Sequence, residues 1–319
     1  MKANAFVHIG FPKTGTTSIQ KSLAASRDAL KQHGITYPGA EDDHANLTAL
    51  FHPKGPDHFY FSLRSISNPV RLGTQLLAEG LSSEGDLIFS SEYLHNIGEK
   101  HAQKLYGTLS DAGFRSKFIC YVRHPVDAAV SSAQQSIKMG DRGLAEVIAD
   151  PRYTFIQQNV EPFIRAVGKE NVILKDFNIS AREGLLRSFM CSVGRPELTE
   201  ALVEIPANES LTMDAALFCD LHRMHLNETG RDLFPKSVIF QFTDGKFDLP
   251  VKTKEAVRAM GQKDIEWVET EFGITLLESN YPVRYHQNPS LGSVAKVIEA
   301  IRYPGVLRDK VLANEGPKK

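Results

Sequence analysis

The chain has 319 residues, of which 42% are hydrophobic and 24% are charged, so it can bury a sizeable core like an ordinary globular protein. The formal net charge is −1, which excludes a general basic surface for nucleic acid and restricts any anion site to a local group of residues. The sequence has no apolar run of transmembrane length and no apolar leader after its first residues, so we expect a cytoplasmic protein without a transmembrane segment.

The first predicted elements are a strand, a glycine-containing turn and a helix. The apolar residues 5–9 predict a buried strand, and residues 16–32 have the apolar spacing of a helix that ends before Gly34. Gly10 and Gly15 lie in the turn between them. In this arrangement free backbone N–H groups and the positive end of the helix converge on one anion, so the stretch predicts a phosphate-binding loop.

The side chains of this loop favour a bound phosphate over an ordinary turn. Lys13 adds a positive charge, and Thr16 and Thr17 add hydroxyl donors where the helix begins. In nucleoside triphosphatases the loop lysine directly follows the second glycine. Here Thr16 has that position after Gly15, and Lys13 precedes the glycine. The alternative is a strand, turn and helix without a ligand, which needs neither the lysine nor the paired threonines.

The next part of the chain contains one clear strand among short helices. In order, we expect an extended piece at 35–38, a short helix from about His44, a helix at 70–82, a strand at 86–89 and a helix at 99–111. Segment 52–68 is rich in proline, glycine and aromatic residues and predicts a loop, which either shapes an acceptor pocket or covers the core. Glu92 follows the strand and therefore lies at the edge of the sheet.

The remaining elements complete an α/β protein. We expect a strand at 114–122, a helix from Pro125, one or two helices at 144–167, a strand at 171–174 and helices at 182–191, 211–227, 254–272 and 294–303. Strands separated by helices predict a central parallel sheet covered by helices. We therefore expect a single domain with an α/β core at about 1–195, a helical C-terminal portion at about 196–305 and a polar tail at about 306–319. Trp267 lies at helical spacing with other apolar residues and predicts core packing.

A second motif begins where the strand at 114–122 ends. Arg123 closes this strand, and Ser131 lies about two turns into the following helix. The guanidinium offers a fork of donors for a phosphate, and the serine offers a hydroxyl. The alternative for Arg123 is an ion pair with a carboxylate such as Asp127. We expect His124 only to flank this phosphate site.

Together the two motifs resemble those of the PAPS-dependent sulfotransferases, whose donor is 3′-phosphoadenosine 5′-phosphosulfate. Residues 12–17 read Pro-Lys-Thr-Gly-Thr-Thr, like the family's 5′-phosphosulfate loop, and Arg123 with Ser131 resembles its 3′-phosphate motif. The resemblance covers roughly residues 5–190 and implies a P-loop-like sulfotransferase fold. Shorter similarities to the bacterial branch occur at residues 90–92, 208–211 and 264–267. The Arg-Lys-Gly triplet of the cytosolic enzymes is absent, and Ser18 replaces their adenine-stacking tryptophan.

The resemblance implies a role for each of these residues. The donor contacts fall on Lys13, Thr14, Gly15, Thr16, Thr17, Ser18, Arg123 and Ser131. Lys13 also neutralises the leaving oxygen, and Glu92 is the general base, with His44 as the alternative. Glu92 is otherwise a carboxylate that stabilises a helix N-terminus. His8 lies within the first strand, where we expect it to pack in the core.

The implied reaction moves a sulfuryl group to a hydroxyl or amine of a carbohydrate, glycolipid or small metabolite. No metal is expected, and the scattered cysteines Cys120, Cys191 and Cys219 predict neither a disulfide framework nor a metal site. The competing interpretations are a P-loop kinase or nucleoside triphosphatase that depends on Mg²⁺, and a non-catalytic nucleotide-binding protein. The acceptor and the oligomeric state stay open.

Overall fold

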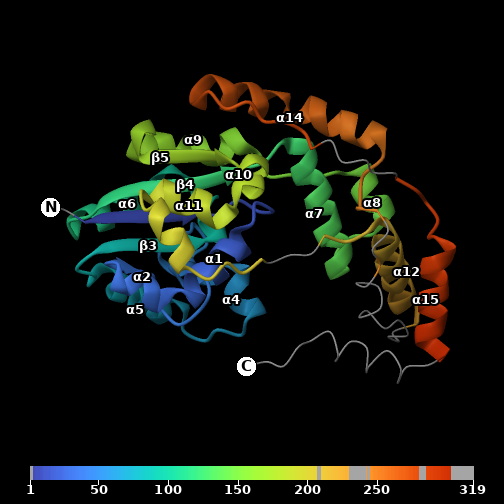
Figure 1. The fold of residues 1–319 in the computed structure, drawn as a ribbon, viewed down its shortest axis with the longest axis horizontal. Helices are drawn as coiled ribbons and strands as arrows, with labels where there is room; N and C mark the ends of the chain where they lie inside the picture. Colours follow the sequence, from blue (N-terminus) through green and yellow to red (C-terminus); the bar gives the residue numbers. More distant parts are fainter. Residues whose placement is uncertain (1–2, 207–209, 230–241, 243–244, 280–284, 303–319) are drawn as a thin grey trace. The chain divides into compact units, whose positions relative to one another are not determined.

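The computed structural model describes residues 3–206, 210–229, 242, 245–279 and 285–302. The chain divides into two compact units (Figure 1). The first comprises residues 1–124, 154–208 and 262–277, and the second comprises residues 125–153, 209–261 and 278–319. The polar tail and the resemblance at 208–209 lie outside the described residues.

The first unit is built on a parallel sheet with the strand order β2-β3-β1-β4-β5. The strands are β1 Asn4–Ile9, β2 Ile35–Thr36, β3 Asp86–Ser91, β4 Arg115–Val122 and β5 Val172–Asp176. The predicted central parallel sheet covered by helices is confirmed. The strand predicted at 86–89 extends to Ser91, which pairs in register with Ile9, so Glu92 follows it directly.

Helices cover both faces of this sheet (Figure 1). The helices that lie wholly in the first unit are α1 Thr16–Ala25, α2 Arg27–Gln32, α3 Thr48–Phe51, α4 Phe59–Leu63, α5 Pro69–Leu81, α6 Gly98–Asp111, α9 Ile156–Val167, α10 Phe177–Glu183 and α11 Leu185–Val193. The single helix predicted at 16–32 is two helices, because the chain departs from helical geometry at Ser26, whose hydroxyl accepts the Val203 N–H at 2.9 Å. Segment 52–68, predicted as a loop, contains α4.

The two faces of β1 pack against different helices, and this arrangement shows where the sheet can bind a ligand. Ala5, Val7 and Ile9 share a core with α3, α5, α6 and α9, whereas Phe6 shares a core with α1, α2 and α11. The helix after β1 therefore lies on one face of the sheet, and α6, which follows β3, lies on the other. Neighbouring strands whose connections leave in opposite directions form a topological switch point, and open α/β sheets bind ligands there. Here that point lies between the carboxyl ends of β1 and β3.

The second unit is helical, which confirms the predicted helical character of the C-terminal portion. It contains α7 Pro125–Met139, α8 Leu144–Ala149, α12 Met213–Thr229, the first part of α14 Val251–Phe272, and α15 Leu291–Arg302. Its core includes Ile137, Val147, Phe218 and Val297. The rest of α14 belongs to the first unit, where Trp267 packs against the core. Among the helices in the described residues, none is both long and apolar enough to cross a membrane.

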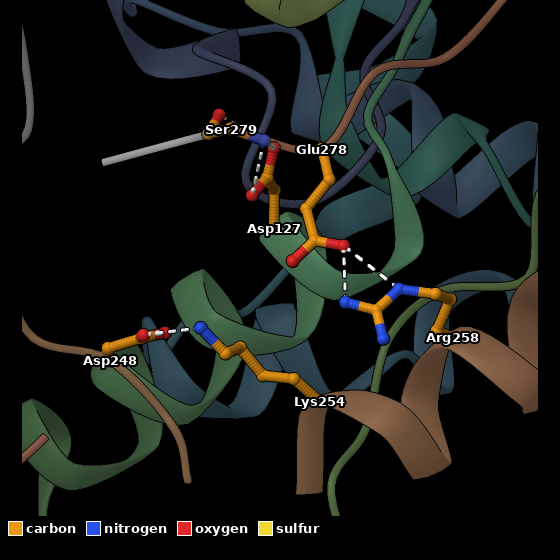
Figure 2. Close-up of polar contacts among 6 residues, drawn as sticks. All are labelled: Asp127, Asp248, Lys254, Arg258, Glu278 and Ser279. Atoms are coloured by element: carbon orange, nitrogen blue, oxygen red, sulfur yellow. Dashed lines mark hydrogen bonds and ion pairs between the residues drawn. The ribbon is translucent and has the colours of Figure 1, made fainter. Parts of the chain in front are cut away.

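Polar contacts fix the ends of these second-unit segments (Figure 2). Asp127, in the first turn of α7, accepts hydrogen bonds from the backbone N–H and the hydroxyl of Ser279, the latter at 2.8 Å. Arg258 donates to Glu278, with 2.7 Å between guanidinium and carboxylate. Lys254 donates to Asp248 at 2.6 Å. The Asp127 carboxylate, a candidate partner for Arg123 in the sequence, thus receives two donors from Ser279.

Candidate functional site

The loop between β1 and α1 is held in one shape by its glycines. The Gly10 N–H donates to the Ser91 carbonyl at 3.1 Å, which joins the loop to the end of β3. A Cβ on Gly10 would fall 2.5 Å from the Thr16 side chain, and one on Gly15 would fall 2.4 Å from Leu185. Gly15 also has φ +72°, in the left-handed region that favours glycine. Both predicted loop glycines are therefore required by close packing.

Lys13 has an unusual backbone conformation within this loop. Its φ is +66°, and Ser65 is the other non-glycine residue with positive φ among those described. Such a conformation costs about 1–3 kcal/mol and is concentrated at functional sites, where the surrounding structure enforces it. The half-buried Lys13 side chain lies within electrostatic reach of Glu92 and opposes the rise in the pKa of that carboxyl group.

The start of α1 presents backbone donors at the same place. The helix begins after Gly15 without a capping side chain, and its first turn carries no acidic residue. The Thr14 and Thr16 hydroxyls both donate to the Phe11 carbonyl, at 2.7 and 3.2 Å, and so stabilise the loop itself. Thr17 is half-buried at the first turn. Uncapped N–H groups and the positive end of the helix favour an anion here.

Glu92 lies beside this loop. It directly follows Ser91, and a Cβ on Gly10 would lie 3.2 Å from the Glu92 Cα. Burial raises the pKa of the half-buried Glu92 carboxyl group, the Lys13 charge lowers it, and the Asp43 charge raises it further. A carboxylate with a raised pKa is a better proton acceptor near neutral pH. Glu92 is also the first residue of a short 3₁₀ helix, Glu92–Leu94, and the side chain of its N-cap residue, Ser91, makes no capping hydrogen bond.

His44, the alternative base, is at odds with this role in the structure. Its side chain is completely buried, and its Nδ1 accepts the Ser90 N–H at 2.8 Å. Its Nε2 therefore carries the proton and donates to the Pro38 carbonyl, also at 2.8 Å. Burial lowers the pKa of His44 to about 3. No ring lone pair is left to take a proton, because both nitrogens hold the backbone together.

His8 lies in the core, as the sequence predicts. It is completely buried within β1, and its Nδ1 is 2.8 Å from the Ser90 hydroxyl. Burial lowers its pKa to about 3 as well. Ser90 is thus fixed from two sides, by His8 and by His44. The two histidines set the position of the end of β3, from which Glu92 follows.

Arg123 approaches the loop from the neighbouring strand β4. Its guanidinium lies over the Phe177 ring, 5.2 Å from the centroid. The same ring lies 2.9 Å from a Cβ built on Gly15. A single aromatic ring therefore lies between Arg123 and the Lys13 loop. This spacing provides two separate groups of anion donors at one edge of the sheet.

Asn178, next to Phe177, orients the guanidinium. Its Oδ1 accepts from the Arg123 Nε at 3.1 Å, and its Nδ2 donates to the Leu277 carbonyl at 3.3 Å. Neither Phe177 nor Asn178 was identified from the sequence. The available signal was their position directly after β5, since carboxyl ends of parallel strands meet at one sheet edge.

Ser131, the predicted partner of Arg123, lies half-buried in α7. It belongs to the second unit and Arg123 to the first, so their joint contact with one phosphate stays a prediction. Within the described ranges, no three His, Cys, Asp or Glu side chains gather in an arrangement that would hold a metal ion.

Comparison with known proteins shows a similarity in fold to solved structures. No protein-family model and no curated protein matches the chain. The crystal structure of a sulfotransferase from Alicyclobacillus acidocaldarius is similar to it, with 17% sequence identity and a TM-score of 0.49. The similarity covers 86% of this chain and 98% of that one.

Proposed function

We propose that this chain transfers a sulfuryl group from 3′-phosphoadenosine 5′-phosphosulfate to a hydroxyl or amine of a carbohydrate, glycolipid or small metabolite. The observation that carries the proposal is the position of Lys13, in the loop after β1, and of Glu92, directly after the neighbouring strand β3, at the switch point of the sheet. One group carries the positive charge that a leaving phosphate oxygen needs, and the other is a proton acceptor. We further expect a cytoplasmic setting, in keeping with three cysteines that form no disulfide.

The two anion-binding groups of the site suit the two phosphate ends of 3′-phosphoadenosine 5′-phosphosulfate. The Lys13 loop and the start of α1 would take the 5′-phosphosulfate through N–H groups and the ammonium. Arg123, oriented by Asn178, would take the 3′-phosphate, with Ser131 as its partner. A donor with only one phosphate group would use half of this site.

The chemistry follows from these positions. The acceptor oxygen attacks sulfur, the bond from sulfur to the 5′-phosphate oxygen breaks, and adenosine 3′,5′-bisphosphate leaves. The acceptor proton moves to the Glu92 carboxylate. Lys13 and the loop N–H groups stabilise the negative charge that grows on the leaving oxygen, a contribution made mainly in the transition state.

A P-loop kinase or nucleoside triphosphatase is the second candidate, because the acidic Glu92 at the end of β3 has the position that a metal-binding carboxylate would need. The threonine at position 16, where such loops carry lysine, counts against it. A non-catalytic nucleotide-binding protein is the third candidate.

Calorimetry with adenosine 3′,5′-bisphosphate, AMP and ATP, each with and without Mg²⁺, separates these functions. We expect the bisphosphate to bind at least about tenfold more tightly than AMP, since a charge-assisted contact contributes roughly 1.5–3 kcal/mol. Its affinity should not depend on Mg²⁺. Tight, Mg²⁺-dependent binding of ATP would indicate a kinase instead, and equal affinities for AMP and the bisphosphate would exclude Arg123 and Ser131 as a 3′-phosphate site.

A further inference from the structure

An aromatic cluster begins at the residue next to Glu92. The Tyr93 ring contacts the rings of His58, Phe59 and Tyr60, with centroids 5.0, 5.6 and 5.3 Å away. Phe59 is 54% exposed although it packs against two rings of the cluster. These four residues are here called the aromatic cluster. Three of them, His58, Phe59 and Tyr60, lie in segment 52–68, for which the sequence left open an acceptor pocket or a cover of the core.

Asp43 carries a charge beside both Glu92 and this cluster. Its half-buried carboxylate accepts the Ala45 N–H at 2.8 Å, which fixes its position. Burial raises the pKa of Glu92, Tyr60 and Tyr93, and the Asp43 charge raises each of them further. Asp43 is therefore within electrostatic reach of the base and of two rings at once.

Arg64 is within electrostatic reach of Asp43, Tyr60 and Tyr93. Its guanidinium lies over the Tyr60 ring, 5.9 Å from the centroid, and it lowers the pKa of Asp43, which burial raises. Lys54 is within electrostatic reach of His58 in the cluster, and Lys13 faces the donor in the proposed function. Near the base, the acceptor thus meets two carboxylates, phenol groups and exposed ring surface.

We propose that the aromatic cluster and Asp43 form the acceptor subsite, and that it takes a ring bearing a hydroxyl and no negative charge, with Asp43 as the residue that repels anionic acceptors. This inference rests on the proposed sulfuryl transfer. Aromatic faces are electron-rich and attract the C–H edges of a sugar or phenol ring. A half-buried carboxylate that can accept a bond from a neutral hydroxyl repels an anion at the same place.

The first test compares matched neutral and anionic acceptors. Initial rates of bisphosphate release would be measured with methyl β-D-glucopyranoside against its glucuronide, and with p-cresol against p-hydroxyphenylacetate. We expect at least one neutral acceptor to exceed its anionic partner about tenfold in kcat/KM. The pair of acceptors that reacts shows whether the subsite takes a sugar or a phenol. An anionic acceptor as good as its neutral partner would overturn the proposal.

The second test assigns the selectivity to Asp43. Asp43→Asn keeps the oxygen that accepts the Ala45 N–H, and it should reduce the preference for neutral acceptors to within about threefold. Asp42→Asn, on the adjacent exposed side chain, is the matched control and should leave the preference unchanged. The same preference in wild type and Asp43→Asn, or the same loss in Asp42→Asn, would show that Asp43 is not the selective residue.

The third test concerns the aromatic surface and needs no buried substitution. Phe59→Ala should raise the acceptor KM about tenfold while calorimetry shows unchanged affinity for the bisphosphate. Phe155→Ala, at a side chain that is 40% exposed elsewhere in the first unit, should change neither. If wild type fails to bind the bisphosphate, the proposed function itself is wrong. If the bisphosphate complex forms but shows no saturable binding of any of the four acceptors by NMR, only the acceptor subsite is wrong.

Discussion

The Arg123 Nε donates to the Asn178 Oδ1 at 3.1 Å, and the same asparagine donates through Nδ2 to the Leu277 carbonyl. The amide is thus fixed on one side by the backbone and presents its oxygen to the guanidinium on the other. Because the Phe177 ring also lies under the guanidinium, Arg123 has its orientation before any ligand arrives. Such preorganisation reduces the entropy that binding would otherwise have to remove.

Asn178→Ala should therefore weaken the proposed contact between Arg123 and the 3′-phosphate, although Asn178 itself does not contact the ligand in this proposal. We expect the affinity for adenosine 3′,5′-bisphosphate to fall about tenfold, the size of one hydrogen bond to a charged group. Affinity for AMP should stay within about twofold. Calorimetry with both ligands measures the difference, and Asn159→Ala, which removes a half-buried asparagine of α9, is the control. An equal loss for both ligands would indicate general destabilisation.

Lys13→Ala and Arg123→Ala should separate turnover from donor binding. The partner charge of Lys13 develops in the transition state, so its loss should lower kcat chiefly. In the proposed function Arg123 contacts a phosphate that is charged throughout, so its loss should raise the donor KM by about tenfold to a hundredfold. Steady-state kinetics with varied donor distinguishes them. A Lys13→Ala enzyme with a normal kcat and a raised donor KM would exclude the catalytic role.

Glu92→Gln keeps the size of the side chain but removes its ability to take a proton. We expect kcat to fall at least about a hundredfold, since a general base contributes typically 10²–10⁴-fold. Bisphosphate affinity and Tm should remain near wild type, and Glu84→Gln, at an exposed position, should be fully active. If Glu92 only stabilises its short helix, the variant would instead lose about 0.3–1 kcal/mol of stability and keep its activity.

Gly15→Ala and Gly34→Ala form a matched pair. Both glycines have φ near +70°, but a Cβ on Gly15 would lie 2.4 Å from Leu185, whereas one on Gly34 meets no atom within 4 Å. Each substitution incurs the left-handed strain of about 1–2 kcal/mol. Gly15→Ala should also displace the loop and remove donor binding. Urea unfolding and calorimetry compare them, and equal effects of the two substitutions would show that the contact with Leu185 is unimportant.

Acid should unfold this protein through His8 and His44. Both have a folded pKa of about 3 against an ordinary value of 6.5, so the unfolded state binds more protons between these pH values. The free energy of unfolding should accordingly be constant above about pH 6.5 and fall below it, by up to about 1.4 kcal/mol per pH unit for each histidine.

The slope of this dependence can be assigned to one residue. Urea unfolding of His8→Leu between pH 7 and pH 5 should show a slope smaller by about one histidine's share. His33→Gln, which removes an exposed histidine, should keep the wild-type slope. A wild-type slope in His8→Leu would mean that the buried ring does not govern acid unfolding.

The amino-acid sequence alone was enough to predict the Lys13 loop, Arg123 at its strand end and the alternation of strands and helices. These are local properties, since turn glycines, apolar periodicity and a basic residue at a strand end are written in neighbouring positions. The positions of Lys13 and Glu92 at one edge also followed, because parallel strands carry their carboxyl ends to the same side.

The hydrogen bonds at both ring nitrogens of His44, and the contacts of Asn178 and Phe177 with Arg123, became visible in the tertiary structure alone. His44 is bonded to Ser90 and Pro38, and Asn178 to Arg123 and Leu277, so these roles depend on residues that meet only when the sheet forms. Burial then decides which group can take a proton, because the surroundings that shift a pKa come from the whole fold rather than from neighbours in the chain.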